Sequence, residues 1–344
     1  MTLDKIGDIA NPTLSEVSTP FSEVWDTTSE WDAGTHTRTS ARASLLEPGY
    51  RDDHDDGTID PELVDANLDS GGEDEGSTVT GAYWYDFNQA KTTRVLYEGM
   101  DISGYDFTVI YKLEHTNTGT GEGDPQITAC WGDAAAASAN IAGAQAWDND
   151  QDLRNVWISS SGSESSTDLT GTVKTAGDVF WLKLVYDNSA SSYTSYYATS
   201  DPFSGGSWSQ IGSESEHYNP KYYGYAGDDG DGAIYYSYVR PSDGNYQTEW
   251  RDAGGGGGSA SLDDLTVTCT LPGTYSVNYT VKTSDDASTV KGSTSGTLAD
   301  GTNTYDVSGV VDGQYVAVAF TFSASQLDTT DAPTIDSAEI AGTE

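Results

Sequence analysis

Basic residues are scarce in this chain. Its 344 residues include 55 Asp and Glu against 15 Lys and Arg, a formal net charge of −40 at pH 7. Phosphate binding needs Lys and Arg, so nucleic acid is excluded as a direct partner. A charge so far from zero also destabilises a compact chain through self-repulsion. Molar salt shortens the Debye length to about 3 Å and screens that repulsion, so the composition predicts a protein that folds and works in concentrated brine.

Long apolar runs and sorting signals are also lacking. No stretch of 18 apolar residues occurs, so we expect no membrane insertion. The first residues, MTLDKIGDIANPTLSEV, show no basic region, apolar core or small-residue cleavage site of a signal peptide. A virion protein leaves its host by lysis and needs no such signal. We therefore expect a protein of a haloarchaeon or one of its viruses; the alternative is a calcium-loaded extracellular adhesin.

Cysteine is nearly absent. Cys130 and Cys269 fall in segments that we assign to different domains, so the sequence predicts no disulfide framework. Both are expected to be buried as small apolar side chains. The four histidines lie far apart in the sequence and show no zinc-ligand spacing.

Aromatic residues and glycine, by contrast, are abundant, with 22 Tyr, 9 Trp and 38 Gly. Segments such as YDFTVIYKLEH (105–115) and FWLKLVYD (180–187) alternate apolar and polar residues, the period of a half-buried strand. Glycine- and serine-rich turns separate these segments, and long helical patterns are hard to find. The sequence therefore predicts an all-β protein.

Shifts in composition divide the chain into parts. The expected division is a leader or anchor arm at 1–20, a large domain at 21–250, a glycine linker at 251–258 and a small β-sandwich at 259–344. A run of glycines has no side chains to pack and behaves as a flexible coil. Within the large domain, residues 51–76 contain eleven acids and are expected to form an acidic insertion.

The strongest strand pair lies at 178–212, and it carries a resemblance. Its features are the W-L-K-L run at 181–184, the segment 196–201, and Trp208 shortly before an Ile-Gly pair. This pattern resembles the concanavalin A-like (laminin-G-like) jelly-roll family. The resemblance is clearest over 178–240 and implies a jelly roll over 21–250. That fold hosts lectins, hydrolases and structural modules, so it does not specify a function.

A second resemblance concerns the end of the chain. The pattern QYVAVAFTFSAS followed by APTIDSAEI is similar to small immunoglobulin- or fibronectin-like sandwiches appended to tail and fibre proteins of tailed viruses. The fold class that we expect is therefore all-β, with a concanavalin A-like jelly roll followed by a smaller immunoglobulin-like β-sandwich.

Catalytic patterns are missing from the sequence. Retaining glycosidases hold two carboxylates about 5–5.5 Å apart, and the glucanases of this fold place them as E-x-D-x-E on one strand, a triplet not found here. The nearest candidates are Asp106 with Glu114, and Glu214 with Glu216. There is no G-x-S-x-G elbow and no nucleotide-binding loop. We expect a protein that is not an enzyme.

Two groups of residues are candidate ligand sites. Asp228, Asp229 and Asp231 lie in the tight turn GDDGDG and offer oxygen ligands for calcium; the alternative is that they are solvated acids. Aromatic residues near strand ends, with acids beside them, are of the kind that bind sugars; the alternative is that they pack in the core or at its rim. The candidate sugar-binding residues are Trp131, Asp133, Trp147, Asp148, Tyr222, Tyr223 and Tyr225.

Brine chemistry, the missing signal peptide and two β domains together predict a structural and attachment protein of a haloarchaeal tailed virus, located in the virion. A fibre, spike, turret or baseplate component would fit. Its expected partners are other virion proteins, further copies of itself as a trimer or pentamer, and host surface glycans or S-layer. The alternatives are a purely architectural capsid or tail decoration protein and a polysaccharide-active hydrolase of the same fold.

Overall fold

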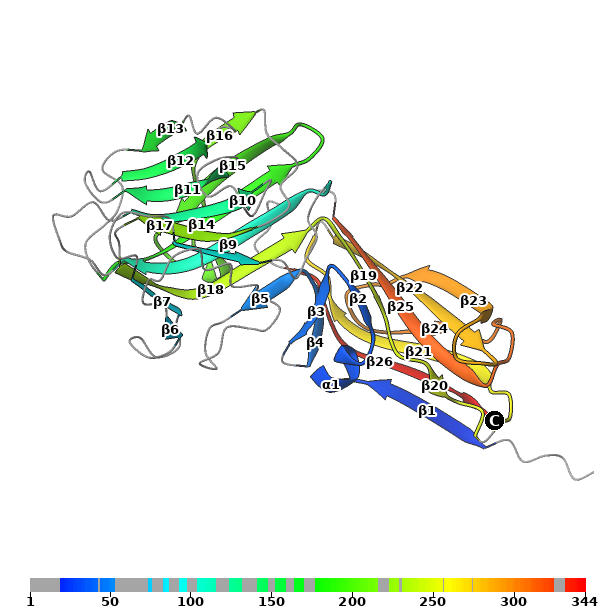
Figure 1. Ribbon diagram of the computed structural model, residues 1–344. Helices are drawn as coiled ribbons and strands as arrows, with labels where there is room; N and C mark the ends of the chain where they lie inside the picture. The colour runs from blue at the N-terminus through cyan, green and yellow to red at the C-terminus, as the bar shows by residue number, and fades with distance from the viewer. Residues whose placement is uncertain are drawn as a thin grey trace, which may run out of the picture.

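A computed structural model of the chain shows two β-sandwiches (Figure 1). The residues that the structure describes are 19–42, 44–52, 74–75, 83–86, 93–97, 104–115, 124–131, 141–147, 152–158, 164–169, 177–215, 223–228, 231–255, 257–273, 275–324 and 332–344. The all-β class and the presence of two sandwiches are confirmed. No helix in these ranges is long and apolar enough to cross a membrane.

The larger sandwich consists of an eight-stranded and a six-stranded antiparallel sheet. Its strands are β5 (Tyr50–Asp52), β6 (Asp74–Glu75), β7 (Tyr83–Asp86), β8 (Thr93–Tyr97), β9 (Phe107–His115), β10 (Asp124–Trp131), β11 (Ile141–Trp147), β12 (Asp152–Ile158), β13 (Glu164–Leu169), β14 (Val179–Asp187), β15 (Ser192–Ala198), β16 (Ser209–Ser215), β17 (Tyr223–Asp228) and β18 (Asp231–Pro241). The larger sheet has the order β16-β15-β14-β9-β18-β7-β6, with β5 also paired to β18. The other sheet has the order β13-β12-β11-β10-β17-β8.

The smaller sandwich consists of two six-stranded sheets. Its elements are β1 (Pro20–Trp25), α1 (Thr28–Asp32), β2 (Thr35–Thr37), β3 (Thr39–Arg42), β4 (Leu45–Pro48), β19 (Asp243–Gln247), β20 (Arg251–Asp252), β21 (Ser261–Thr270), β22 (Tyr275–Ser284), β23 (Val290–Thr297), β24 (Gly301–Asp306), β25 (Tyr315–Ala324) and β26 (Thr334–Thr343). One sheet has the order β24-β21-β26-β4-β3, with β1 also paired to β26. The other has the order β2-β19-β25-β22-β23, with β20 also paired to β25.

Alternation explains why these segments form strands. In β22, every second residue from Tyr275 to Thr283 is buried while the residues between them face outward. The inward side chains of both sheets meet in one core, which includes Leu265, Val281 and Phe320. In β14, by contrast, five consecutive residues are buried, so this strand is covered on both faces.

The expected order of the two domains is wrong. Strand β1 pairs with β26 over its whole length, from Pro20 opposite Thr343 to Trp25 opposite Ala338. Strand β4 also pairs with β26, and β2 pairs with β19. The described residues from Pro20 to Pro48 therefore belong to the smaller sandwich, and the larger sandwich is inserted between β4 and β19. The physical reason is that Trp25 and Trp31 are fully buried in the core of the smaller sandwich.

The glycine run is not a linker between the sandwiches. Strands β20 and β21, on either side of it, both belong to the smaller sandwich. The amides of Ala253 and Gly254 donate to the carbonyl of Gln314 at 2.8 and 3.0 Å, and the amide of Gly258 donates to the carbonyl of Gly254 at 2.8 Å. A Cβ at position 254 would clash with the carbonyl of residue 258. The expected linker at 251–258 thus begins with strand β20, and its described residues from Ala253 on form backbone hydrogen bonds, with glycine permitting close backbone approach.

Two other expectations concern regions that the structure covers sparsely. The leader at 1–20 lies outside the described residues except for its last two, and the insertion at 51–76 is described only at 51–52 and 74–75. The structure also bears on the expectation that the two cysteines lie in different domains. Residue 130 lies in β10 and residue 269 in β21, so the two belong to different sandwiches. Cys269 is a buried free thiol whose pKa is raised to about 11, chiefly by burial.

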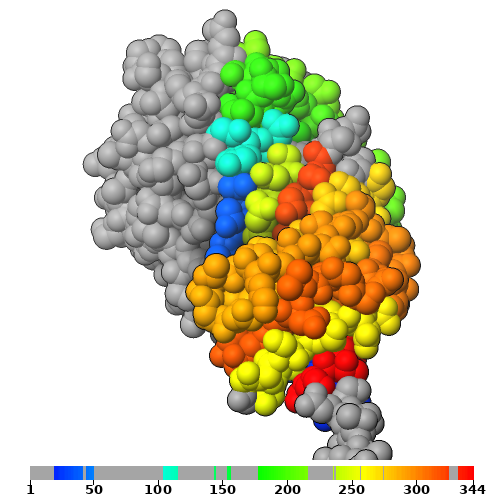
Figure 2. Space-filling model, turned by 90° about the vertical axis from the view of Figure 1, so that its right-hand side faces the viewer, coloured from blue at the N-terminus to red at the C-terminus, as the bar shows by residue number. Residues whose placement is uncertain are grey.

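Two short crossings join the sandwiches. Gly49 alone separates β4 from β5, and Ser242 alone separates β18 from β19. Gly49 has a φ of 94°, and a Cβ there would clash with the carbonyl oxygen of Val239 in β18, three residues before the other crossing. In Figure 2 the blue and yellow-green segments lie side by side between the cyan part of the larger sandwich and the orange part of the smaller one.

Side-chain contacts hold this junction. The guanidinium of Arg38 donates two hydrogen bonds to the carboxylate of Asp243, at 3.0 and 2.9 Å. It also lies 3.8 Å from the ring centroid of Tyr105 in the larger sandwich. The amide of Ser242 donates to the carbonyl of Asp106 at 2.8 Å. The contact with Tyr105 and the bond to Asp106 thus link the two sandwiches beside the crossings.

Replacing Gly49 by alanine is expected to destabilise this junction. A left-handed backbone alone costs an alanine roughly 1–2 kcal/mol, and at Gly49 the methyl group would also displace the backbone of Val239. Gly205, with a φ of 96° and open space around it, is the matched control. We expect the loss of unfolding free energy, measured in molar salt, to be at least about twice as large for G49A as for G205A. Equal losses would show that the crossing tolerates displacement.

Candidate functional site

The eight-stranded sheet of the larger sandwich has two different faces. One face packs on the six-stranded sheet, where Leu113, Leu182 and Leu184 are buried and the hydroxyl of Ser195 donates to the side-chain oxygen of Asn155 at 2.6 Å. Side chains alternate along a strand. The residues between these inward ones therefore project from the opposite, outer face of the sheet.

Register brings lysines and aromatic residues together on the outer face. Trp181 of β14 lies opposite Lys112 of β9, and Lys183 of β14 lies opposite Tyr196 of β15. Directly opposed residues of an antiparallel pair project from the same face and are in contact range. Four side chains from three strands thus become neighbours.

Each lysine lies against two aromatic rings. The Nζ atom of Lys112 is 5.6 Å from the ring centroid of Trp181 and 5.1 Å from that of Tyr235. The Nζ atom of Lys183 is 4.5 Å from the ring centroid of Tyr196 and 4.7 Å from that of Trp208. All four distances are within the range of about 6 Å over which a cation is attracted to a ring face. We call this set the lysine–aromatic row: Tyr235, Lys112, Trp181, Lys183, Tyr196 and Trp208.

A β-bulge places Tyr235 in the row. The register between β18 and β9 shifts between Ile234 and Tyr236, so Tyr235 has no partner of its own in the ladder. Its ring lies by Lys112, and its hydroxyl donates a hydrogen bond to the carboxylate of Glu114. Burial, and then the bond to Glu114, raise the pKa of Tyr235 to about 12. The phenol therefore stays neutral, and it holds one carboxylate beside the row.

The smaller sandwich closes one end of this outer face. The hydroxyl of Tyr238 donates to the carbonyl of Pro48 at 3.2 Å, and the buried guanidinium of Arg240 lies 5.5 Å from the ring centroid of Tyr275. Further along, Trp181 and Lys183 are 8% and 3% exposed. The other row members and Glu114 are partly exposed. The row is therefore a partly open strip beside the junction, and domain junctions are common places for ligand sites.

Sugar binding at the aromatic residues that the sequence singled out stays a prediction, because the structure gives only the strand positions of four of them. Trp131 ends β10 and lies opposite Ile141, the first residue of β11, whereas Trp147 ends β11. These two tryptophans are therefore at opposite ends of one hairpin. Tyr223 begins β17, and Tyr225 lies within that strand rather than in a loop. Asp133, Asp148 and Tyr222 lie outside the described residues.

The acidic turn is described only in part. Asp228 ends β17 in the six-stranded sheet, where it lies opposite Asp124. Asp231 begins β18 in the eight-stranded sheet, where it lies opposite Asp86 of β7. Asp229 lies outside the described residues. Among the side chains that the structure describes, no group of three or more His, Cys, Asp or Glu residues could hold a metal ion. A calcium site at the turn stays a prediction.

The carboxylate pairs considered for hydrolysis are not paired where the structure describes them. Asp106 precedes β9 and Glu114 lies near its end, so eight residues of extended chain, roughly 26 Å, separate them. Glycosidase carboxylates are at most about 9.5 Å apart. The carboxylate of Asp106 instead accepts the amide of Asn188 at 2.7 Å. Glu214 lies in β16, and residue 216 is outside the described ranges.

Comparison with known proteins gave distant structural similarities. No protein-family model matches the sequence, and no curated protein matches it. The VIP36 exoplasmic/lumenal domain in its Ca²⁺/Man₃GlcNAc-bound form has 11% identity and a TM-score of 0.37, over 56% of this chain and 90% of that one. Lectin II from Ulex europaeus has 11% identity and a TM-score of 0.32, over 66% and 98%. The Lotus tetragonolobus seed lectin has 11% identity and a TM-score of 0.32, over 60% and 97%.

Proposed function

We propose that this protein binds glycans on a host surface, as a non-enzymatic structural and attachment protein of a haloarchaeal tailed virus. The observation that supports this proposal is the lysine–aromatic row. Indole and phenol rings offer flat apolar surfaces on which the C–H faces of sugars stack. Charged and phenolic groups beside the rings accept and donate hydrogen bonds to hydroxyls, the mixture that ligand sites use to fix orientation.

The row has the dimensions of an oligosaccharide site. It crosses from β18 through β9, β14 and β15 to Trp208, which directly precedes β16. Four strand spacings of about 4.8 Å give a length of roughly 19 Å. Several aromatic faces along that length could bind successive sugar units of one chain, and repeated weak contacts then add up to useful affinity.

The rest of the molecule fits a component of a particle. The net charge of −40 suits a virion exposed to brine. The bonded junction would hold the row in a fixed position relative to the smaller sandwich, which could contact other virion proteins or further copies of this chain as a trimer or pentamer. A fibre, spike, turret or baseplate position would place the row outward.

Glycan binding in molar salt tests this function. We expect labelled oligosaccharides of a halophilic host surface to bind the wild-type protein, and Tyr196→Ala to weaken that binding by about tenfold, or 1.4 kcal/mol. Tyr197→Ala is the matched control, because Tyr197 is the next residue of β15, is also partly exposed, and projects from the opposite face. Circular dichroism would establish that both variants fold.

Two outcomes would contradict the proposal. One is a folded wild-type protein that binds no glycan in molar salt. The other is an equal loss of binding in both variants, which would place the ligand away from the row. A protein that binds no glycan, but stays on purified particles with the outer face of the eight-stranded sheet covered by neighbours, would support the architectural alternative.

A further inference from the structure

Lys112 has an unusual environment for a base in so acidic a chain. The structure gives its ammonium two ring contacts, to Trp181 and Tyr235, and no ion pair with any described residue. Two other described bases do lie against carboxylates: Arg38 contacts Asp243, and Lys291 contacts Asp285 at 2.9 Å. In a chain with 55 acids, a partly exposed ammonium that lies near two rings and has no carboxylate partner among the described side chains is a place for an external anion.

Glu114, the nearest acid on the same strand, does not pair with the ammonium of Lys112. Glu114 lies two residues beyond Lys112 on the same face, but its carboxylate accepts the hydroxyl of Tyr235. The two rings hold the ammonium from both sides, so little side-chain entropy remains to be lost when an anion binds. Lys112 is only partly exposed, and partly buried pairs are screened by salt much less than exposed ones.

We propose that the row selects acidic sugars, with the ammonium of Lys112 binding a carboxylate or sulfate of a sugar whose ring stacks on the partly exposed Tyr235. This inference rests on the proposed function and names its ligand class. Lys183 adds positive potential from its nearly buried position between Tyr196 and Trp208. Elsewhere the net charge of −40 repels anions, so the row would be a local exception, and such electrostatic complementarity gives specificity.

Matched pairs of polymers that differ only in charge test the inference. The uronate arm compares oligogalacturonate with its methyl ester, and the sulfate arm compares dextran sulfate with dextran, all titrated against the full chain in molar salt. We expect the acidic member of at least one pair to bind at least about tenfold more tightly than its neutral counterpart. The arm that shows the preference identifies the acidic group.

Variants assign the preference to Lys112. Lys112→Met keeps much of the apolar stem and removes the charge, and it should bring the affinity for the acidic polymer down to that for the neutral one. Lys112→Arg should keep the preference, because the charge and the ring contacts survive. Lys291→Met removes an exposed lysine of the smaller sandwich and should change nothing.

The outcomes separate the two proposals. Equal binding of acidic and neutral polymers, or an acidic preference that survives in Lys112→Met, would overturn the inference and leave the proposed function standing. Absence of binding by all four polymers and by host oligosaccharides would overturn both. If Lys112→Met fails to fold, the wild-type comparison within each pair still decides whether acidic sugars are preferred.

Discussion

Lowering the salt concentration from molar to about 0.1 M is expected to unfold this protein, because the Debye length then grows from about 3 to about 10 Å. Even if each of the 15 bases neutralised one of the 55 acids, 55 − 15 = 40 carboxylates would remain unpaired. Their mutual repulsion favours any expanded state. The nine tryptophans make intrinsic fluorescence, followed together with circular dichroism during dialysis, a suitable measurement.

Acidification separates repulsion from a specific need for ions. At 0.1 M salt, a shift to about pH 4 protonates many carboxylates of ordinary pKa, and we expect part of the native signal to return. If instead the chain stays folded at 0.1 M salt and neutral pH, the composition does not reflect adaptation to brine. If molar sucrose restores folding as well as salt does, general exclusion from the surface, rather than screening, is the cause.

Sequence patterns predicted the strands well but could not predict which sandwich they join. The alternation in YSVNYTVKTS and FWLKLVYD follows from the two-residue repeat of a strand, and both segments form strands. The pairing of β1 with β26 joins residues more than 300 positions apart, as in the bond from Ser22 to Glu339. Nothing local in the segment around Trp25 indicates that its partner is the last strand of the chain.

In the lysine–aromatic row, too, the sequence indicates which residues share a strand face but not which strands are neighbours. A lysine amid the apolar residues of FWLKLVYD, two positions after Trp181, is a local signal that both project from one face of β14. That signal was available in the sequence and could have drawn attention to Lys183. The neighbours depend on register: Lys112 comes from β9 and Tyr196 from β15. Tyr235 joins through a bulge, which alternation alone would not predict.

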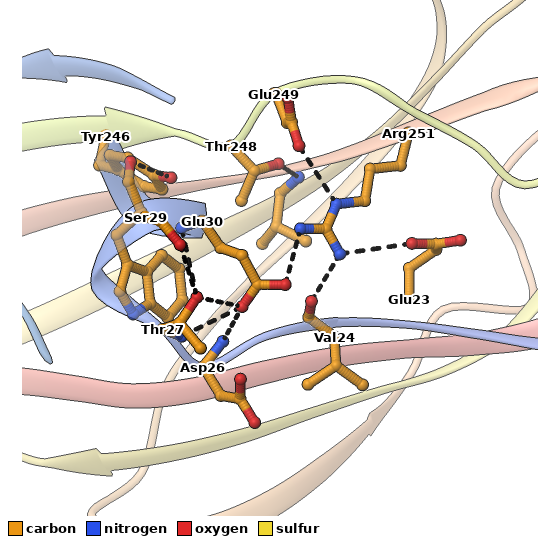
Figure 3. Close-up of polar contacts among 12 residues, drawn as sticks. Glu23, Val24, Asp26, Thr27, Ser29, Glu30, Tyr246, Thr248, Glu249 and Arg251 are labelled. Carbon is orange, nitrogen blue, oxygen red and sulfur yellow. Dashed lines mark hydrogen bonds and ion pairs between the residues drawn. The ribbon is translucent and has the colours of Figure 1, made fainter. Parts of the chain in front are cut away.

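The second large effect is expected at Arg251, which ties the N-terminal segment to the smaller sandwich (Figure 3). Its guanidinium donates to the carbonyl of Val24 at 2.5 Å and to the carboxylate of Glu30 at 3.1 Å. It also contacts the carboxylates of Glu23 and Glu249 at 3.4 and 3.5 Å. It lies 4.6 Å from the ring centroid of the buried Trp25. One cation therefore neutralises a cluster of acids at the edge of the core.

Glu30 has a second role at the start of α1. Its carboxylate accepts the backbone amides of Asp26 and Thr27 at 3.0 and 3.1 Å, completing a capping box with Thr27. The bond from Asp26, followed by those from Thr27 and Arg251, lowers the pKa of Glu30 to about 2. Because the folded pKa lies below the ordinary value of 4.5, this carboxylate stabilises the fold fully above about pH 4.5. That contribution is lost as the pH falls toward about 2.

Replacing Arg251 by methionine is therefore expected to lower the free energy of unfolding by about 2–3 kcal/mol in molar salt, a loss between those of exposed and buried ion pairs. The methionine keeps an apolar stem against Trp25 but leaves three carboxylates close together without their cation. Lys291→Gln breaks the exposed pair with Asp285 and should cost at most about 0.5 kcal/mol. Thermal unfolding of both variants at neutral pH gives the comparison. Equal, small losses would mean that Trp25 and Trp31 hold the N-terminal segment in place without the arginine, and that the repulsion among its acids is already screened by the salt.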